Sequence, residues 1–144
     1  MSFAITPVAD SALVAVQAAT VAWCVQHLSV PVWDYVPETQ TYPFVVVGEA
    51  TEFPHNVHGR FGRRIHQTVH VWTKGREGFA PGLAIVAELQ RLLDHRENDV
   101  GPLVEGHRVQ SIRYGDARPM GDPDPLIRHI PTTFTWITEQ HPPT

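Results

Sequence analysis

Cysteine is nearly absent from this chain of 144 residues, since Cys24 is the only one. No disulfide can therefore form within the chain, and no cluster of thiolates can hold a metal. Cys24 lies in an apolar run, which favours a small buried thiol. No segment reaches the roughly 18 consecutive apolar residues of a membrane-spanning helix. The first six residues lack the basic region of a signal peptide. We therefore expect intracellular synthesis and no membrane partner.

Positive charge is also scarce, with 11 Lys and Arg against 15 Asp and Glu, for a net charge of −4. This balance argues against a protein that holds nucleic acid by neutralising phosphates. No Walker, dinucleotide-binding or Gly-x-Ser-x-Gly motif occurs. We therefore expect no cofactor and no catalytic residue. The length fits a single domain over residues 1–144, with residues 139–144 as an extended tail.

Two segments have the periodicity of helices. The first is expected to begin at Thr6-Pro7 or at Asp10-Ser11 and to end at Leu28. Its predicted apolar stripe is Val14, Ala18, Val21, Val25 and Leu28, with Leu13, Val16, Thr20 and Trp23 in a second stripe beside it. The second helix begins near Pro81 and is expected to bury Ile85, Val86, Leu89, Leu92 and Leu93.

Strands are predicted at residues 32–36, 42–48, 63–73, 107–114 and 127–138. Residues 52–62 read as a long loop or an exposed hairpin tip, residues 95–106 as a polar connector and residues 115–125 as a surface loop. Short connections between consecutive strands favour antiparallel pairing. The predicted fold class is therefore α+β, an antiparallel β-sheet with two α-helices packed on one face.

Nine histidines raise the possibility of a metal site. His55 and His58 lie three residues apart, and His66 and His70 lie four apart on one face of a predicted strand. The second pair would be separated by about 13 Å, because an extended strand rises ~3.3 Å per residue. Exposed or interface histidines are therefore favoured, and a small metal-dependent enzyme is the alternative. Three aspartates in residues 115–125 do not match a calcium loop and are interpreted as turn residues.

Basic and aromatic side chains offer a candidate partner surface. The favoured interpretation of residues 59–64 (Gly-Arg-Phe-Gly-Arg-Arg) is a solvated loop tip. The alternative is a contact with nucleic acid or an acidic protein, and of these two partners we prefer a protein. Aromatic residues on strand faces mark both cores and interfaces. The wide apolar face of the first helix favours oligomerisation. The candidate partner-interface residues are Trp33, Tyr35, His55, His58, Arg60, Phe61, Arg63 and Trp72.

Three segments together resemble a known family. They are Tyr-Pro-Phe-Val-Val-Val at residues 42–47, Val-His-Val-Trp-Thr-Lys-Gly at residues 69–75, and Ala-Ile-Val-Ala-Glu-Leu at residues 84–89 with Leu92 and Leu93. These segments and their order resemble the tail-terminator or tail-completion proteins of long-tailed bacteriophages and phage-derived particles, including gene transfer agents. The resemblance extends from Leu13 to Glu139.

The resemblance implies a non-enzymatic virion protein. Such proteins form a ring, commonly a hexamer, at the head-proximal end of the tail tube, where the ring stops tube polymerisation and joins the tail to the head connector. The implied partners are further copies of the chain, the tail tube protein and the connector, with DNA passing through the ring. Six copies at −4 each carry a charge of −24, so we expect an acidic bore to which DNA does not adhere. The alternatives are a head-completion or neck protein, and a host-cell binding module.

Overall fold

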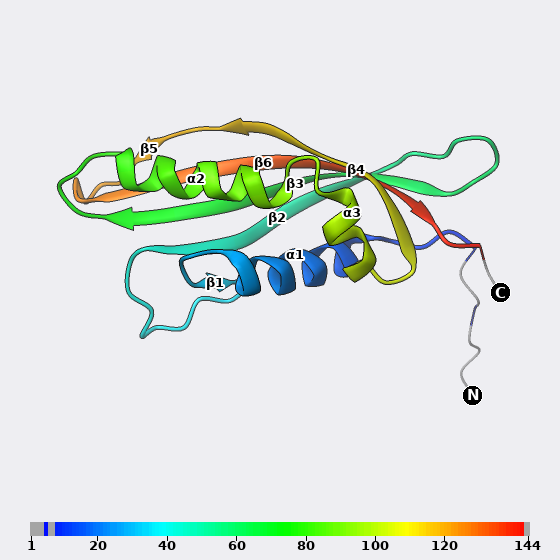
Figure 1. The fold of residues 1–144 in the computed structure, drawn as a ribbon, viewed down its shortest axis with the longest axis horizontal. Helices are drawn as coiled ribbons and strands as arrows, with labels where there is room; N and C mark the ends of the chain where they lie inside the picture. Colours follow the sequence, from blue (N-terminus) through cyan, green and yellow to red (C-terminus); the bar gives the residue numbers. More distant parts are fainter. Residues whose placement is uncertain (1–4, 6–7, 143–144) are drawn as a thin grey trace.

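A single six-stranded sheet, seen in Figure 1, carries all of the helices. The computed structural model describes residue 5 and residues 8–142. The strands are β1 (Val32–Trp33), β2 (Phe44–Pro54), β3 (Gly62–Lys74), β4 (His107–Ala117), β5 (Met120–Gly121) and β6 (Ile127–Gln140). The helices are α1 (Leu13–His27), α2 (Ala80–Leu93), the short α3 (Glu97–Val100) and the 3-10 helix η1 (Gly101–Leu103).

The strand order is β1-β2-β3-β6-β4, and β5 pairs with β6. All pairs except one are antiparallel, so the predicted α+β class is confirmed. The expectation of a wholly antiparallel sheet is wrong at β1, which runs parallel to β2 through Val32 opposite Val45 and Trp33 opposite Val46. The chain returns to the starting end of β1 before β2 begins, so that the two strands run in the same direction. The Val45 N–H donates to the carbonyl of Pro31 over 2.9 Å.

The two long helices pack on one face of the sheet. Along β3, the side chains of Ile65, Gln67, Val69 and Val71 are buried. Those of the alternate residues are not, as a period of two requires. In Figure 1, α2 lies along β3 and β6, while α1 lies beside β2. The other face of the sheet has no layer over it in the described part of the chain. Its side chains, including Trp72, are therefore partly exposed.

The buried side of α1 differs from the main predicted stripe. Val14 and Val25 are 82% and 59% exposed. Val16 and Thr20 of the second predicted stripe are buried together with Ala19 and Cys24. Apart from Leu28, the main stripe does not face the sheet, because this alanine- and valine-rich helix is apolar on most sides and periodicity does not select one face. The alternative start at Thr6-Pro7 lies outside the described residues.

Some elements are longer than predicted, and two segments predicted to be irregular contain secondary structure. Strand β2 continues to Pro54 through an irregularity between Val47 and Ala50. Residues 95–106, predicted as a connector, contain α3 and η1, and the loop predicted at residues 115–125 contains β5. Strand β4 has register shifts after Val109 and after Tyr114.

The two edges of the sheet differ in how their backbone groups are covered. On β4, the carbonyl of Ile112 accepts the His95 N–H and the Tyr114 N–H donates to the Asp94 carboxylate, each over 2.9 Å. The chain after α2 thus occupies the outer edge of β4. On β2, which has 11 residues, β1 pairs only with Val45 and Val46. Within the described residues, no helix is long and apolar enough to cross a membrane.

A buried polar chain joins the sheet to α1. The Trp136 Nε1–H donates to Gln67 Oε1 over 2.9 Å, and Gln67 Nε2 donates to the Thr20 hydroxyl over 3.0 Å. That hydroxyl donates in turn to the carbonyl of Val16 over 2.7 Å. Each of these side chains is at most 1% exposed. The polar atoms are satisfied by one another, which lets a glutamine occupy the core of β3.

Candidate functional site

A two-stranded arm, residues 54–61, projects past the end of the sheet and forms the loop at the right of Figure 1. At its tip, Val57 and Arg60 exchange both backbone hydrogen bonds, over 3.1 and 3.0 Å. The two residues between them, His58 and Gly59, have φ values of 53° and 74°. Two central residues with positive φ define the type I′ turn that matches strand twist. Of the two predictions for residues 52–62, the hairpin is therefore confirmed.

The arm is basic and partly apolar at its surface. It carries His55, His58 and Arg60, and no carboxylate. Val57 and Phe61 are both exposed. Arg60 donates to Glu139 of β6 over 2.8 Å, and this hydrogen bond lowers the pKa of the glutamate below its usual range. The arm therefore presents the exposed Val57 and Phe61 beside one arginine, which is paired with Glu139.

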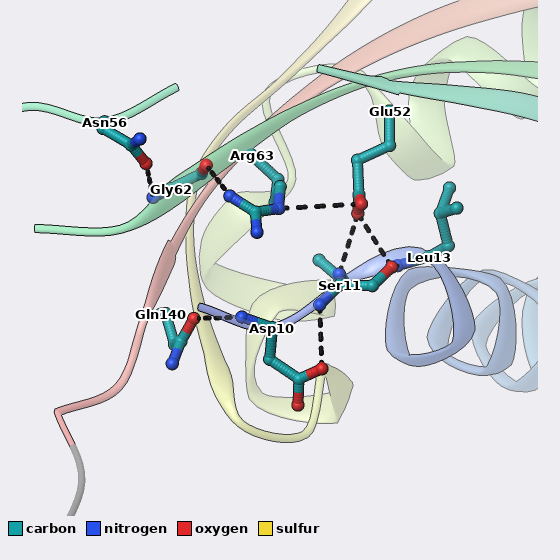
Figure 2. Close-up of polar contacts among 9 residues, drawn as sticks. Asp10, Ser11, Leu13, Glu52, Asn56, Gly62, Arg63 and Gln140 are labelled. Carbon is teal, nitrogen blue, oxygen red and sulfur yellow. Dashed lines mark hydrogen bonds and ion pairs between the residues drawn. The ribbon is translucent and has the colours of Figure 1, made fainter. Parts of the chain in front are cut away.

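The base of the arm is linked to the start of α1 through Glu52, as Figure 2 shows. One carboxylate oxygen of Glu52 accepts the Ala12 N–H over 2.8 Å and the Ser11 hydroxyl over 3.1 Å. The other oxygen lies 3.6 Å from the guanidinium of Arg63. Glu52 thus satisfies a free N–H at the helix start while neutralising a half-buried arginine on β3.

The chain before α1 is held by the end of β6. Gln140 accepts the Asp10 N–H over 2.8 Å, and its amide donates to the carbonyl of Val8 over 3.0 Å. On the arm side, the Gly62 N–H donates to Asn56 Oδ1 over 3.2 Å (Figure 2). The start of α1, the base of the arm and the last residues of β6 therefore form one connected corner of the molecule.

A hollow of about 590 Å³ lies next to this corner, between α1 and η1. Its apolar lining includes Val14, Ala18 and Leu103, and its carboxylates are Asp10 and Glu105. No lysine or arginine lines it among the described residues. We call it the α1–η1 hollow. The hollow is therefore apolar and carries two carboxylates, and His107 and His141 also line it.

A separate polar cluster lies on the uncovered face of the sheet. His70 contacts the Glu49 carboxylate through Nε2 over 2.9 Å and His129 through Nδ1 over 2.6 Å. With Glu49 ionised, a neutral His70 carries its proton on Nε2 and accepts the Nε2–H of His129. Trp72 stacks on His129, with ring centroids 4.0 Å apart and an interplanar angle of 2°.

The local backbone makes room for this cluster. A Cβ on Gly48 would lie 2.6 Å from His70 Cδ2, so only glycine allows the imidazole to lie flat on β2. Burial raises the pKa of Glu49, but hydrogen bonds from its own backbone and from His70 outweigh that effect and lower it. Burial and the neighbouring His70 lower the pKa of His129.

The predicted interface residues do not form one site. His55, His58, Arg60 and Phe61 lie together in the arm, with Arg63 at its base. Trp72 belongs to the stacked cluster on the uncovered face. Trp33 and Tyr35 lie at β1, where the Trp33 indole donates to Gln40 Oε1 over 2.8 Å and Tyr35 is fully open to solvent.

Sequence reasoning missed Glu49 and His129. The first depends on the irregularity in β2, and the second on the register that places His129 opposite Trp72. The two histidines considered as a pair have different partners, since His66 packs on Phe53 while His70 contacts His129. Among the described residues, no three His, Cys, Asp or Glu side chains are arranged to hold a metal ion.

The fold is shared with chains of known structure. A chain of the solved structure "Virion of native gene transfer agent (GTA) particle" matches it with a TM-score of 0.76 and 20% identity, covering 90% of this chain and 98% of that chain. A second solved chain matches with a TM-score of 0.54 and 18% identity, covering 89% and 98%. At these identities the likeness shows a shared fold. The comparison with curated proteins finds no match.

The family follows from the sequence of nearly the whole chain. The model of the family described as "Tail completion protein gp17" matches residues 9–139. The chain belongs to this family and is a structural protein of the tail of a phage or phage-like particle. The resemblance found in the strand and helix segments is thereby confirmed.

Proposed function

We propose that this chain forms a ring, expected to be a hexamer, at the head-proximal end of the tail tube. There the ring stops tube polymerisation and joins the tail to the head connector. The observation that carries this proposal is the match of residues 9–139 to the tail completion family. The partners are then other copies of the chain, the tail tube protein and the connector protein.

The way in which the edge of the sheet at β4 is covered supports a subunit of a closed assembly. The outer edge of β4 is occupied by Asp94 and His95, so it does not offer free backbone groups there to another strand. Covering an edge in this way prevents open-ended growth through sheet pairing. Contacts between copies are then left to side-chain surfaces and to β2. Two different surfaces that meet head to tail close a ring when the rotation between neighbouring copies fits.

The proposed ring also has to let DNA through. A chain of net charge −4 gives six copies a charge of −24, which opposes adhesion of DNA to the bore. We expect labelled duplex DNA not to bind the purified protein at physiological salt. Strong binding that weakens steeply as salt is raised would contradict the acidic bore, because such a slope reports phosphate neutralisation.

Imaging of particles that lack this chain tests the main proposal. A terminator predicts overlong tails, because nothing then stops the tube. A neck protein, the alternative within the same particle, predicts tails of normal length that are not attached to heads. Adding the purified chain to growing tubes in vitro gives a second measurement. Tubes that keep elongating in its presence would contradict the terminator role.

A further inference from the structure

We propose that the tip of the arm, Val57 to Phe61, docks into the α1–η1 hollow of a second copy of this chain. The contact rests on the proposed self-assembly and goes further, since it names the two surfaces that meet. It is head to tail, because each copy offers an arm to one neighbour and a hollow to the other. Repeated contacts of this kind can close a ring.

The tip has the form of an inserted element. Its type I′ turn at His58 and Gly59 gives it a defined shape, so little conformational freedom is lost on docking. Val57 is 46% exposed and Phe61 is also open to solvent. Their side chains gain from leaving water at roughly 25 cal/mol for each Å² of apolar surface buried.

The arm cannot turn back onto its own chain. Arg60 is held by Glu139, and the Gln140 N–H donates to the carbonyl of Phe61 over 2.8 Å. These two contacts fix the direction of the arm relative to β6. Its apolar tip is therefore available to another molecule rather than to its own α1.

The hollow is suited to such a tip in size and in charge. Its volume of about 590 Å³ is within the range of 300–1,000 Å³ typical of binding pockets. Leu103 is 46% exposed and Val14 more so, which leaves an apolar floor uncovered. Asp10 and Glu105 beside that floor complement Arg60 of the tip, whose side chain is 70% exposed although it is paired with Glu139. Opposite charges on the two surfaces also set the orientation of the contact.

Cysteine cross-linking of the full-length protein tests the contact. Val57→Cys and Leu103→Cys are prepared separately, mixed and oxidised with oxidised glutathione. The native Cys24 does not interfere, because burial raises the pKa of its thiol to about 12 and keeps it from reacting. We expect a disulfide-linked dimer containing one copy of each variant, detected by non-reducing electrophoresis and mass spectrometry.

The matched control is Leu83→Cys mixed with Val57→Cys. Leu83 is 45% exposed on α2, so it equals Leu103 in chemistry and exposure but does not line the hollow. The proposal expects at least tenfold less heterodimer from the control pair. Equal yields from the two pairs, or none from either, would overturn it.

A second experiment uses interface-breaking variants. Val57→Asp has an intact hollow, and Leu103→Asp has an intact arm. Each alone is expected to be monomeric by native mass spectrometry, while their mixture gives a one-to-one dimer and nothing larger. A mixture that stays monomeric, or single variants that assemble like the native chain, would refute the docking. Neither experiment involves tail tubes, so its failure is distinct from failure of the terminator role.

Discussion

The carboxylate of Glu52, on β2, accepts the backbone N–H of Ala12, at the start of α1, over 2.8 Å. The two residues are 40 positions apart in the sequence. A helix start is usually capped by a nearby serine, threonine, aspartate or asparagine. Here a distant strand supplies part of the cap, so the position of α1 depends on the sheet.

Replacing Glu52 is predicted to loosen α1. Glu52→Ala removes the acceptor for the Ala12 N–H and the partner of Arg63, and we expect it to lower the free energy of unfolding by about 1–2 kcal/mol. Glu52→Gln retains an acceptor oxygen and is expected to lose less. Urea denaturation measures both. Glu38→Ala, which removes an exposed glutamate outside the α1–η1 hollow, is the control, and an equal loss in the control would refute the role of Glu52.

The arm should depend on glycine at position 62. A Cβ there would meet the carbonyl oxygen of His55 and lie 2.7 Å from that of Thr138, both of which are backbone groups that move little. We expect Gly62→Ala to lower the unfolding free energy by roughly 2 kcal/mol or more, in the range of overpacked sites. Gly121→Ala is the control, because its added methyl group meets nothing within 4 Å. The midpoint of unfolding of this variant should be nearly unchanged.

The buried polar chain gives a third prediction. Gln67→Leu removes the acceptor of the Trp136 indole and the donor to the Thr20 hydroxyl, which leaves a buried N–H without a partner. Such a loss costs about 1–3 kcal/mol. Thermal unfolding measures it. The double variant Gln67→Leu with Trp136→Phe removes the unpaired N–H and should recover part of the loss. This account would be contradicted if the double variant lost more stability than the two single variants lose together.

Stability is predicted to fall on mild acidification. Burial lowers the pKa of His107 below its ordinary value of 6.5, and burial together with His70 does the same for His129. Below pH 6.5 the unfolded chain therefore binds more protons than the folded chain, so the free energy of unfolding falls as pH decreases. Above pH 6.5 both states are neutral at these positions, and the contribution is fully present.

The measurement is the urea midpoint at pH 7.5, 6.5 and 5.5. We expect it to decrease between the last two values and to decrease less in His107→Leu, which has no group to protonate. A further loss is expected below about pH 4.5, where Glu49, whose pKa is lowered mainly by hydrogen bonds that outweigh burial, takes up a proton. A midpoint that rises between pH 6.5 and 5.5 would exclude the histidine contribution.

Much of the sheet could be predicted from alternation alone. The strands predicted at residues 63–73 and 127–138 are observed, and buried residues alternate along them because only one side of the sheet is covered. In α2 the predicted Ile85, Val86, Leu89 and Leu93 are buried for the corresponding reason, while Leu92 is only partly buried. The parallel pairing of β1 could not be predicted, since a strand of two residues carries too little pattern to specify a direction.

The candidate site was only partly predictable. The basic and aromatic composition of residues 59–64 marked the arm, but its contrast with an acidic hollow depends on α1 and η1 coming together. The exposure of Val14 and Val25 could not be predicted, because a helix that is apolar on most sides does not reveal which side faces the sheet. The cluster of Glu49, His70 and His129 needs strand register, which the sequence does not state.

The type I′ turn at the tip of the arm lies outside the hydrophobic core. Residues 54–61 add little to the core, and Gly62 marks the point at which the hairpin departs from it. This segment is thus an exchangeable module. Grafting the corresponding hairpin of a related particle onto this scaffold would transfer the choice of neighbour without redesign of the fold, and the length of the hairpin could diverge between lineages at little cost to folding.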